Sequence, residues 1–489
     1  MAILAIDAGT TGVTALIVDD SGTVRSRGYA DFPQHFPQPG WVEHDPEEIW
    51  DAALRAISDA RNAADEQLTA IGITNQRETI VLWNRRTLRP IRPAIVWQDR
   101  RTAPLVDELR ARAVERNVRA STGLNLDPYF SSTKLLWLQR NEPDSWQQVL
   151  NGTTAIGTVD SYLLARLTNG AVHATDATNA SRTQLFNIRT GDWDDDLLDL
   201  FGVPRTALPA VLPSYSEFGT SDPDAFLGLR LPITGVAGDQ QAALFGQTAF
   251  DAGDAKCTYG TGAFVLMNTG TRFVESERGL LGTIAVQHPG GRIDYALEGS
   301  VFTAGAAVQW LRDGLGIIKY AADIEDLALE VDDSGGVVFV PALTGLGAPH
   351  WDPYARGALL GVTRGTNRAH IARATLEAIA FQVQDVVQAM ARDAKTSLTS
   401  LRVDGGAAAN DLLLQIQADV LQTPVLRTQS LEMTGLGAAF LAGLGSGVWG
   451  SRAELRRTLR IERTFEPVSA GPDQEAWRRA VDRARAWID

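Results

Sequence analysis

Cysteine, clustered histidine and long apolar runs are all scarce in this sequence. The single cysteine, Cys257, excludes an intrachain disulfide and leaves no cysteine pair for a structural zinc ion. The six histidines are scattered and form no HExxH pair. No stretch approaches the ~18 uninterrupted apolar residues that a membrane span needs, and the opening Met-Ala-Ile-Leu-Ala-Ile-Asp lacks the basic region of a signal peptide. We therefore expect a cytoplasmic protein with no membrane span.

Positive charge is also in short supply. The 489 residues include 45 Lys and Arg against 59 Asp and Glu, which gives a net charge of −14. Nucleic-acid-binding proteins usually present a basic face, so we expect no nucleic-acid partner. Nucleotide binding stays open, because local backbone N–H groups and a metal ion can hold small phosphates. At ~150 residues per domain, the length indicates roughly two to four domains.

The sequence does contain the same order of predicted strands and turns in two places. Apolar residues 3–6 and 13–18 flank a turn of small residues, and so do residues 256–259 and 263–267. Short apolar runs on either side of a polar or glycine-rich turn are typical of paired strands. Both places therefore predict strand, turn and strand.

A helix and a further strand follow each of these units. Residues 47–64 have apolar positions every four residues, with Asp45 expected at the N-cap, and lead to the apolar run 70–73. In the second half, apolar positions between 376 and 390 fall at spacings of three and four and precede the run 398–403. The repeated order predicts a duplicated α/β fold with a cleft between its two domains.

The boundary between the two domains is expected near the middle of the chain. The stretch 204–232, rich in proline and glycine, precedes the second unit. We place the N-terminal domain at residues 1–248 and the C-terminal domain at residues 249–489.

Three turns of small residues each follow a strand-like run, at residues 7–12, 260–262 and 404–407. Backbone N–H groups in such turns can approach a phosphate, and a carboxylate at the strand end, such as Asp7, can hold Mg²⁺ directly or through water. Each turn alone also fits an ordinary glycine-containing hairpin. Their recurrence favours one nucleotide held between two domains. None resembles a Walker loop or a GxGxxG opening a helix, so a P-loop or Rossmann fold is not supported.

Two groups of polar residues at strand ends suggest catalysis. Asp239 and Gln240 end an apolar run, where the carboxylate could accept a proton from a substrate hydroxyl that the amide orients. Asp239 as the cap of a following helix is the alternative, and the two roles are compatible.

Arg77 and Glu78, which follow the apolar run 70–73, could bind vicinal hydroxyls, with Trp97 and Tyr129 covering the C–H side of a small polyol. The alternative is a surface ion pair beside core aromatic residues.

Five longer segments are distinctive. They are Pro-Gly-Trp-Val-Glu-His-Asp-Pro (39–46), Gly-Ile-Thr-Asn-Gln-Arg-Glu-Thr (72–79), Asp-Pro-Tyr-Phe-Ser (127–131), Ala-Gly-Asp-Gln-Gln-Ala-Ala-Leu-Phe-Gly-Gln (237–247) and Gly-Leu-Gly-Ala-Pro (345–349). These segments are similar to those of glycerol kinases in the FGGY carbohydrate kinase family, and the resemblance covers nearly the whole chain. It implies an α/β fold of duplicated actin-like ATPase (ribonuclease H-like) domains around an interdomain cleft. It also implies phosphorylation of a polyol hydroxyl, with ATP and Mg²⁺ required.

The resemblance also implies roles for individual residues. Asp239 matches the general base that takes the proton from the attacking hydroxyl. The substrate-binding residues it implies are Arg77, Glu78, Trp97, Tyr129, Asp239, Gln240 and Phe264. The ATP-binding residues it implies are Thr10, Thr11, Gly12, Thr261, Gly305, Gln309, Gly406 and Asn410. The Mg²⁺ carboxylates are Asp7, through water, and Asp239.

Some positions depart from the family pattern. Ala8 and Thr14 stand where glycerol kinases usually have Gln and Arg, which removes a γ-phosphate partner and puts the rate in question. Residues 222–229 replace the loop that binds fructose 1,6-bisphosphate in some members, and Arg189 replaces a phosphorylatable histidine. We expect neither regulator to act here in the known way.

Together these features predict the ATP-dependent phosphorylation of glycerol to sn-glycerol 3-phosphate. Glycerol and ATP are the expected small-molecule partners, and a homo-oligomer, dimer or tetramer, stays open. A kinase of another polyol or ketose, such as erythritol or xylulose, is the first alternative, favoured by Ala8 and Thr14. A nucleotide-dependent binding protein on the same fold is the second, but it would have no need of the polyol residues.

Overall fold

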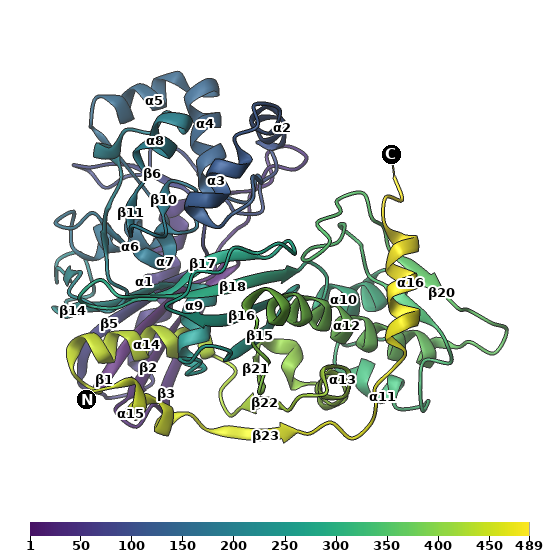
Figure 1. Cartoon of the computed structure of the whole chain (residues 1–489). Helices are drawn as coiled ribbons and strands as arrows, with labels where there is room; N and C mark the ends of the chain where they lie inside the picture. The colour runs from purple at the N-terminus through teal and green to yellow at the C-terminus, as the bar shows by residue number, and fades with distance from the viewer. Residues whose placement is uncertain (489) are drawn as a thin grey trace.

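The computed structural model describes residues 1–488, which form two large mixed sheets (Figure 1). The first sheet has the order β13-β14-β5-β1-β2-β3 and the second the order β17-β18-β16-β15-β21-β22-β23. The strands of the first sheet are β1 (Ala2–Ala8), β2 (Gly12–Asp19), β3 (Val24–Asp31), β5 (Leu68–Asn75), β13 (Gly219–Thr220) and β14 (Pro232–Gly238). Those of the second are β15 (Ala255–Tyr259), β16 (Ala263–Gly270), β17 (Leu281–Gln287), β18 (Ile293–Val301), β21 (Leu401–Asp404), β22 (Val425–Thr428) and β23 (Ile461–Phe465).

The two sheets repeat one pairing pattern. In the first, β1 pairs antiparallel with β2 and parallel with β5, and β5 pairs parallel with β14. In the second, β15 pairs antiparallel with β16 and parallel with β21, and β21 pairs parallel with β22. The predicted duplication of an α/β unit is therefore confirmed, and the strand–turn–strand segments lie where the sequence placed them.

In each half a helix precedes the third strand of this pattern, α1 before β5 and α12 before β21. α1 (Pro46–Asn62) begins after Asp45, whose side chain accepts a hydrogen bond from the backbone N–H of Glu47, as expected of an N-cap. α12 (Arg368–Ala394) contains the whole periodic segment found in the second half. Both helices bury an apolar face against a sheet, because their apolar side chains recur at helical spacing.

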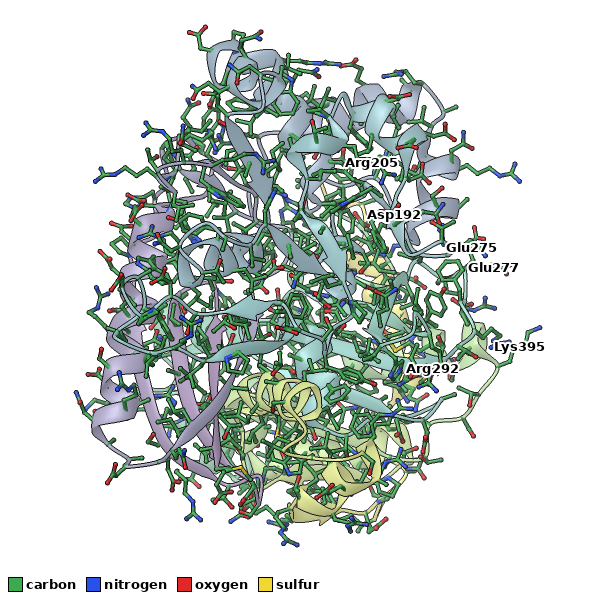
Figure 2. All side chains as sticks on the ribbon, turned by 90° about the vertical axis from the view of Figure 1, so that its left-hand side faces the viewer. Asp192, Arg205, Glu275, Glu277, Arg292 and Lys395 are labelled. Carbon is green, nitrogen blue, oxygen red and sulfur yellow. The ribbon has the colours of Figure 1, made fainter. Side chains whose placement is uncertain are left out.

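Residues between β5 and β14 form an additional layer of the first half, drawn at the top of Figure 1. Its helices are α2 (Ala103–Ala111), α3 (Glu115–Thr122), α4 (Ser131–Asn141), α5 (Pro143–Leu150), α6 (Val159–Leu167), α7 (Ala177–Ala180) and α8 (Asp195–Phe201). Its short strands pair as β6 (Val81–Asn84) with β8 (Thr154–Gly157), β9 (Ala174–Asp176) with β12 (Ala210–Leu212), and β10 (Phe186–Asn187) with β11 (Asp192–Trp193). Another short pair, β4 (Glu43–His44) with β7 (Ala94–Ile95), joins residues before and after β5. Figure 2 shows Arg205 and Asp192 near each other on this layer, where they form an exposed ion pair of 3.1 Å.

Other helices complete the second half and the junction of the two halves. They are α9 (Asp239–Gly246), α10 (Gly305–Asp313), α11 (Asp323–Ala328), α13 (Asp411–Leu421), α14 (Met433–Ser446), α15 (Arg452–Thr458) and α16 (Gln474–Ala484), with the strand pair β19 (Val338–Val340) and β20 (Ala358–Leu360). In the part of the chain that the structure describes, no helix combines the length and apolar character needed to cross a bilayer.

One helix of the second half lies on the first sheet. α14 follows β22 but packs against β1, β5 and β14, beside α9, and shares an apolar core with them (Figure 1). The approach is close: a Cβ at Gly72 of β5 would lie 2.2 Å from the carbonyl oxygen of Ala438. Contacts between the halves thus cross the boundary placed at residues 248 and 249, which stays a prediction.

Candidate active site

The loop after β5 places two charged side chains inside the protein. Arg77 and Glu78 are only 3% and 1% exposed, so they do not form a surface ion pair. Nor do they pair with each other: Arg77 Nε lies 2.9 Å from Asp239 Oδ1, and Glu78 Oε1 accepts a 2.7 Å hydrogen bond from Arg182 Nε. Glu78 has a φ of 63°, a left-handed conformation that is costly for a side-chain-bearing residue and is typical of functional loops.

Asp239 opens α9 at the end of β14. The N-cap is Gly238, so the alternative in which Asp239 itself caps this helix is not what forms. Asp239 Oδ1 accepts a 2.6 Å hydrogen bond from the backbone N–H of Gln240 and faces Arg77. Among residues 1–488 no hydrogen bond reaches Oδ2, and the side chain is 29% exposed. One oxygen of this carboxylate is therefore fixed by the protein while the other is available to a ligand.

Two residues that the sequence interpretation missed complete this ionic cluster. Glu298, in β18 of the second half, accepts hydrogen bonds from Arg77 Nη1 (2.5 Å) and Nη2 (3.0 Å) and from Arg182 Nη2 (3.0 Å). Burial alone would raise the pKa of Glu298, but Arg182 and Arg77 hold it down at about 2. Burial also raises the pKa of Glu78, against the opposing effect of Arg77 and Arg182. Fully desolvated charges of this kind persist because each is paired.

The aromatic residues of the predicted polyol pocket lie together. Trp97 and Tyr129 form an edge-to-face pair with ring centroids 5.5 Å apart. Trp97 Nε1 donates a 3.0 Å hydrogen bond to Thr10 Oγ1, which links the aromatic wall to the first small-residue turn. The segment around Tyr129 is held by the buried Lys134, whose Nζ donates to the carbonyl oxygens of Pro128, Tyr129 and Phe130.

Gln240 is oriented by a buried lysine from the second half. Lys256 Nζ donates hydrogen bonds to Gln240 Oε1, to Thr258 Oγ1 (2.9 Å) and to the carbonyl oxygen of Phe264 (3.4 Å). With its oxygen engaged, the Gln240 amide has its NH₂ group left to donate to a ligand. Phe264 joins the site through this lysine, and the structure brings it into no ring contact with Trp97 or Tyr129.

Two glutamine side chains hold the turn between β1 and β2, which contains Thr10, Thr11 and Gly12, by hydrogen bonds to its backbone carbonyl oxygens. Gln76 Nε2 donates to the carbonyl oxygen of Gly9 (3.0 Å), and Gln34 Nε2 donates to that of Thr10 (2.8 Å). Both amides also contact His44: its Nε2 lies 2.6 Å from Gln34 Oε1, and its Nδ1 lies 3.3 Å from Gln76 Nε2. Burial, with a smaller contribution from His35, lowers the pKa of His44 to about 4. A neutral imidazole with the proton on Nε2 satisfies both contacts.

The second small-residue turn is tied to the start of α10. The backbone N–H of Gly305 donates to the carbonyl oxygen of Gly260 (3.0 Å), and those of Ala304 and Ala306 donate to the carbonyl oxygen of Thr261 (3.0 Å each). Gln309 lies one turn further along α10, exposed at its surface. Thr261, Gly305 and Gln309 therefore share one face of the second half.

The third turn follows β21. Gly405 has a φ of 87°, and a Cβ there would lie 2.5 Å from the carbonyl oxygen of Tyr259 in the neighbouring strand β15. Gly406, by contrast, faces open space. Asn410 caps α13, its Oδ1 accepting a 2.7 Å hydrogen bond from the backbone N–H of Leu413. The turns after β15 and β21 are thus adjacent, because these two strands pair.

Asp7 fits the chemistry of a magnesium carboxylate. It ends β1, and among residues 1–488 its side chain accepts no hydrogen bond. Burial raises its pKa to about 8, with further contributions from the negative charges of Asp239 and Glu432. A divalent cation would compensate that charge. The described residues hold no group of three or more metal-binding side chains.

The register between β1 and β2 places Thr14, one of the positions that depart from the family pattern, beside Asp7. Thr14 of β2 is paired with Asp7 of β1, so the position that is usually arginine lies next to the carboxylate. No side chain of β1 or β2 then supplies a cation there.

A sequence signal exists for the residues that were missed. Lys256 is the one charged residue of β15, and Glu298 lies in the buried part of β18, where Asp294 near the start of the strand is the other charged residue; such charges are usually paired inside the fold. Arg182 carries no such local signal, because polar residues surround it in the sequence, and Lys134 stands between a polar run, 131–133, and an apolar run, 135–138, as an exposed lysine could.

Comparisons with known proteins identify the family and the fold of the chain. The model of the FGGY family of carbohydrate kinases, N-terminal domain, matches residues 2–246, and that of the C-terminal domain matches residues 255–446. A glycerol kinase of Trichlorobacter lovleyi is 55% identical over 493 residues, with 99% of each chain covered, and one of Aromatoleum aromaticum is 56% identical over 494 residues, again with 99% of each covered. The solved structure of Plasmodium falciparum glycerol kinase with ADP superposes with a TM-score of 0.92 at 37% identity, over 99% of this chain and 98% of that one.

Proposed function

The chain belongs to the FGGY family of carbohydrate kinases, and we propose that it transfers the γ-phosphoryl group of ATP to glycerol, forming sn-glycerol 3-phosphate. The observation that carries the proposal is the environment of Asp239. Its Oδ1 is held by Arg77 and by the backbone of Gln240, which leaves Oδ2 for an acceptor hydroxyl. A carboxylate placed in this way is suited to act as a general base in phosphoryl transfer.

Glycerol is the acceptor that the surrounding residues support. Glu78 supplies a buried carboxylate, and the amide of Gln240, fixed by Lys256, supplies a donor. The edge-to-face pair of Trp97 and Tyr129 supplies an apolar wall for the C–H side of a short carbon chain. A three-carbon triol presents both kinds of surface.

The chemical step follows from that placement. As the terminal hydroxyl of glycerol attacks, its proton passes to Asp239 Oδ2, an O–P bond forms to the γ-phosphorus, and the bond to the β,γ-bridging oxygen breaks, releasing ADP. The protein mainly positions the reactants and compensates charge in such a reaction.

The nucleotide phosphates are assigned to the three small-residue turns. We infer that Thr10, Thr11 and Gly12 hold them from the first half, and that the second half contributes Thr261 together with the residues around the nucleotide. These residues are Gly305, Gln309, Gly406 and Asn410. Backbone N–H groups and hydroxyls in turns of this kind bind phosphate without requiring a basic side chain.

Asp7 and Asp239 are the carboxylates that would hold Mg²⁺, which neutralises charge on the phosphates when it is bound. The raised pKa of Asp7, caused by burial and by nearby carboxylates, supports this assignment. Asp239 then has two roles, one toward the metal and one toward the acceptor hydroxyl.

A coupled ADP-release assay across glycerol, dihydroxyacetone, erythritol and xylulose tests the choice of acceptor. We expect the highest kcat/KM with glycerol. A higher kcat/KM with any of the other three would replace glycerol as the assigned substrate.

A further inference from the structure

We propose that Glu298 is a positioning residue for phosphoryl transfer: by holding both Nη atoms of Arg77, it leaves only Nε of that arginine to face Asp239. The proposal rests on the proposed function, because it gives Asp239 the role of general base. It adds a residue of the second half to a polyol site that otherwise consists almost entirely of first-half residues.

The geometry of Arg77 is the starting point. Nη1 and Nη2 lie 2.5 and 3.0 Å from the two carboxylate oxygens of Glu298, while Nε lies 2.9 Å from Asp239 Oδ1. Nη1 also donates a longer hydrogen bond, 3.2 Å, to the neutral Gln241 Oε1, so Glu298 is the charged partner of both terminal nitrogens. A guanidinium group is planar, and its five N–H bonds point in fixed directions. Once both terminal nitrogens are held, the plane of the group and the direction of its Nε–H bond are set.

Loss of Glu298 would change what Asp239 accepts. Asp239 is the other carboxylate in contact with Arg77, and arginine favours bidentate pairing when two carboxylate oxygens are accessible. A guanidinium released from Glu298 can therefore rotate and offer two N–H groups to Asp239. Oδ2 would then be engaged by Arg77 and no longer available to the acceptor hydroxyl.

Glu298 also fixes the second arginine of the cluster. Its Oε1 accepts from Arg182 Nη2 at 3.0 Å, and Arg182 Nε donates to Glu78 at 2.7 Å. The side chains of Arg182 and Glu298 are each 0% exposed, and that of Arg77 is 2% exposed. The same carboxylate thus also contacts Arg182, but its effect on the rate is proposed to act through Arg77, the arginine that faces the base.

Glu298 belongs to the second half of the molecule and Arg77 to the first, so the orientation of Arg77 depends on contact between the two halves. Glu298 lies in the middle of β18, 221 residues from Arg77 along the chain. Because every atom of the pair is buried, the acceptor side of the site has its working geometry only while the two sheets are joined there. The competing explanation is that Glu298 merely balances the charge of two arginines and stabilises the fold.

Glu298→Gln is the primary variant, because it keeps the shape of the side chain but loses one acceptor oxygen and the charge. A misplacement of about 1 Å at a reacting group can cost ~10²-fold in rate. We expect kcat to fall by about that factor, with the KM for ATP changed less than ~3-fold. Glu377→Gln is the matched control: Glu377 is a buried carboxylate of the second half that pairs with Arg373 at 3.1 Å, far from these residues in the chain, and kcat should stay at the wild-type value.

A double-mutant cycle with Arg77→Met separates positioning from fold stabilisation. If Glu298 acts through Arg77, adding Glu298→Gln to Arg77→Met lowers kcat no further than ~3-fold. Wild-type kcat in Glu298→Gln would overturn the proposal. So would losses that multiply in the double variant, because they would mean that Glu298 acts independently of Arg77.

A second single variant covers the outcome in which Glu298→Gln does not fold. Glu298→Asp keeps the buried charge but withdraws the carboxylate by about 1.5 Å, the length of one C–C bond. Charge balance alone predicts wild-type kcat for this variant, which would overturn the proposal, whereas positioning predicts a clear loss. If the wild-type chain prefers another polyol, the same series is measured with that acceptor, so an error in the substrate and an error in the role of Glu298 give different results.

Discussion

The two halves of this molecule share a strand order but supply the site in different ways. The first half contributes charged side chains near the ends of β1, β5 and β14, and the aromatic pair Trp97 and Tyr129 from the segment between β5 and β14. The second half contributes mainly backbone turns, after β15 and β21, and the start of α10. Duplicated folds can therefore diverge in the kind of group that each copy presents while they keep the same pairing of strands.

The exceptions to this division are the buried charges of the second half. Lys256 and Glu298 both point from the second sheet toward residues of the first half, Gln240 and Arg77. Neither Lys256 nor Glu298 is among the residues that we assign to the nucleotide. The second half thus influences the polyol side of the site through two side chains that orient others.

The largest effect that would test this difference between the halves is expected at Asp239, the carboxylate that the first half supplies. Asp239→Asn should lower kcat by about 10²–10⁴-fold, the usual contribution of a general base, while glycerol binding changes little. Steady-state kinetics and calorimetric titration with glycerol measure the two quantities. Turnover of Asp239→Asn at the wild-type rate would remove Asp239 from the role of base.

The backbone turns of the second half can be probed at two adjacent glycines. Gly405→Ala forces a side chain into a φ of 87° and to within 2.5 Å of the Tyr259 carbonyl oxygen, a strain of about 1–3 kcal/mol. We expect a lower thermal midpoint and a raised KM for ATP. Gly406→Ala meets no protein atom, so the midpoint should stay the same while the KM for ATP rises if the nucleotide lies against this residue. An unchanged KM for ATP in both variants would place the nucleotide elsewhere.

The link between the aromatic wall and the first turn predicts a smaller effect. Trp97→Phe keeps an aromatic ring but loses the 3.0 Å hydrogen bond to Thr10 Oγ1. A neutral hydrogen bond contributes ~0.5–1.5 kcal/mol, so kcat/KM for glycerol should fall about 2–10-fold. Trp146→Phe is the control, because Trp146 is a buried tryptophan of the first half whose Nε1 has no hydrogen-bond partner among residues 1–488, whereas Trp97 is half-buried and its Nε1 is bonded. Equal losses in the two variants would show that the Trp97–Thr10 bond has no special role.

The smallest effect concerns the stability of the first half as a function of pH. In the folded protein burial lowers the pKa of His44 to about 4, against 6.5 for the free side chain. Between these values the unfolded chain binds a proton that the folded chain does not, so the free energy of unfolding falls as pH drops from ~6.5 toward 4. His173, whose pKa burial also lowers to about 4, acts in the same direction.

His44→Gln should therefore weaken this pH dependence without abolishing it. Urea unfolding of the wild type and the variant at pH 7 and pH 5 measures the difference. An unchanged difference between the two pH values in His44→Gln would mean that His44 is not the group that titrates.

Local patterns in the sequence were sufficient for the strands beside the small-residue turns and for the two principal helices, but not for β3, β17, β18, β22 and β23. Periodicity predicted α1 and α12, and runs of apolar residues beside small ones predicted β1, β2, β15 and β16, because these signals depend on neighbours in the chain. The family resemblance supplied the roles proposed for the site residues. Hydropathy could not show where α14 would lie, because an apolar helix can cover either sheet.

The ionic cluster could not be predicted from local sequence patterns either, for a related reason. Arg77 and Glu78 are adjacent in the sequence, which suggested an ion pair at the surface, yet each is buried with a different partner. One partner of Arg77, Glu298, is 221 residues away in another sheet. Pairing over that distance is decided by how the sheets join, and no window of the sequence contains both residues.

³¹P NMR of the wild-type chain mixed with glycerol, ATP and Mg²⁺ follows the transferred phosphoryl group itself. A glycerol phosphomonoester signal should grow in step with ADP, one for one. Growth of ADP together with inorganic phosphate, at a rate that glycerol does not change, would contradict the proposed phosphoryl transfer and would indicate a nucleotide-hydrolysing binding protein instead.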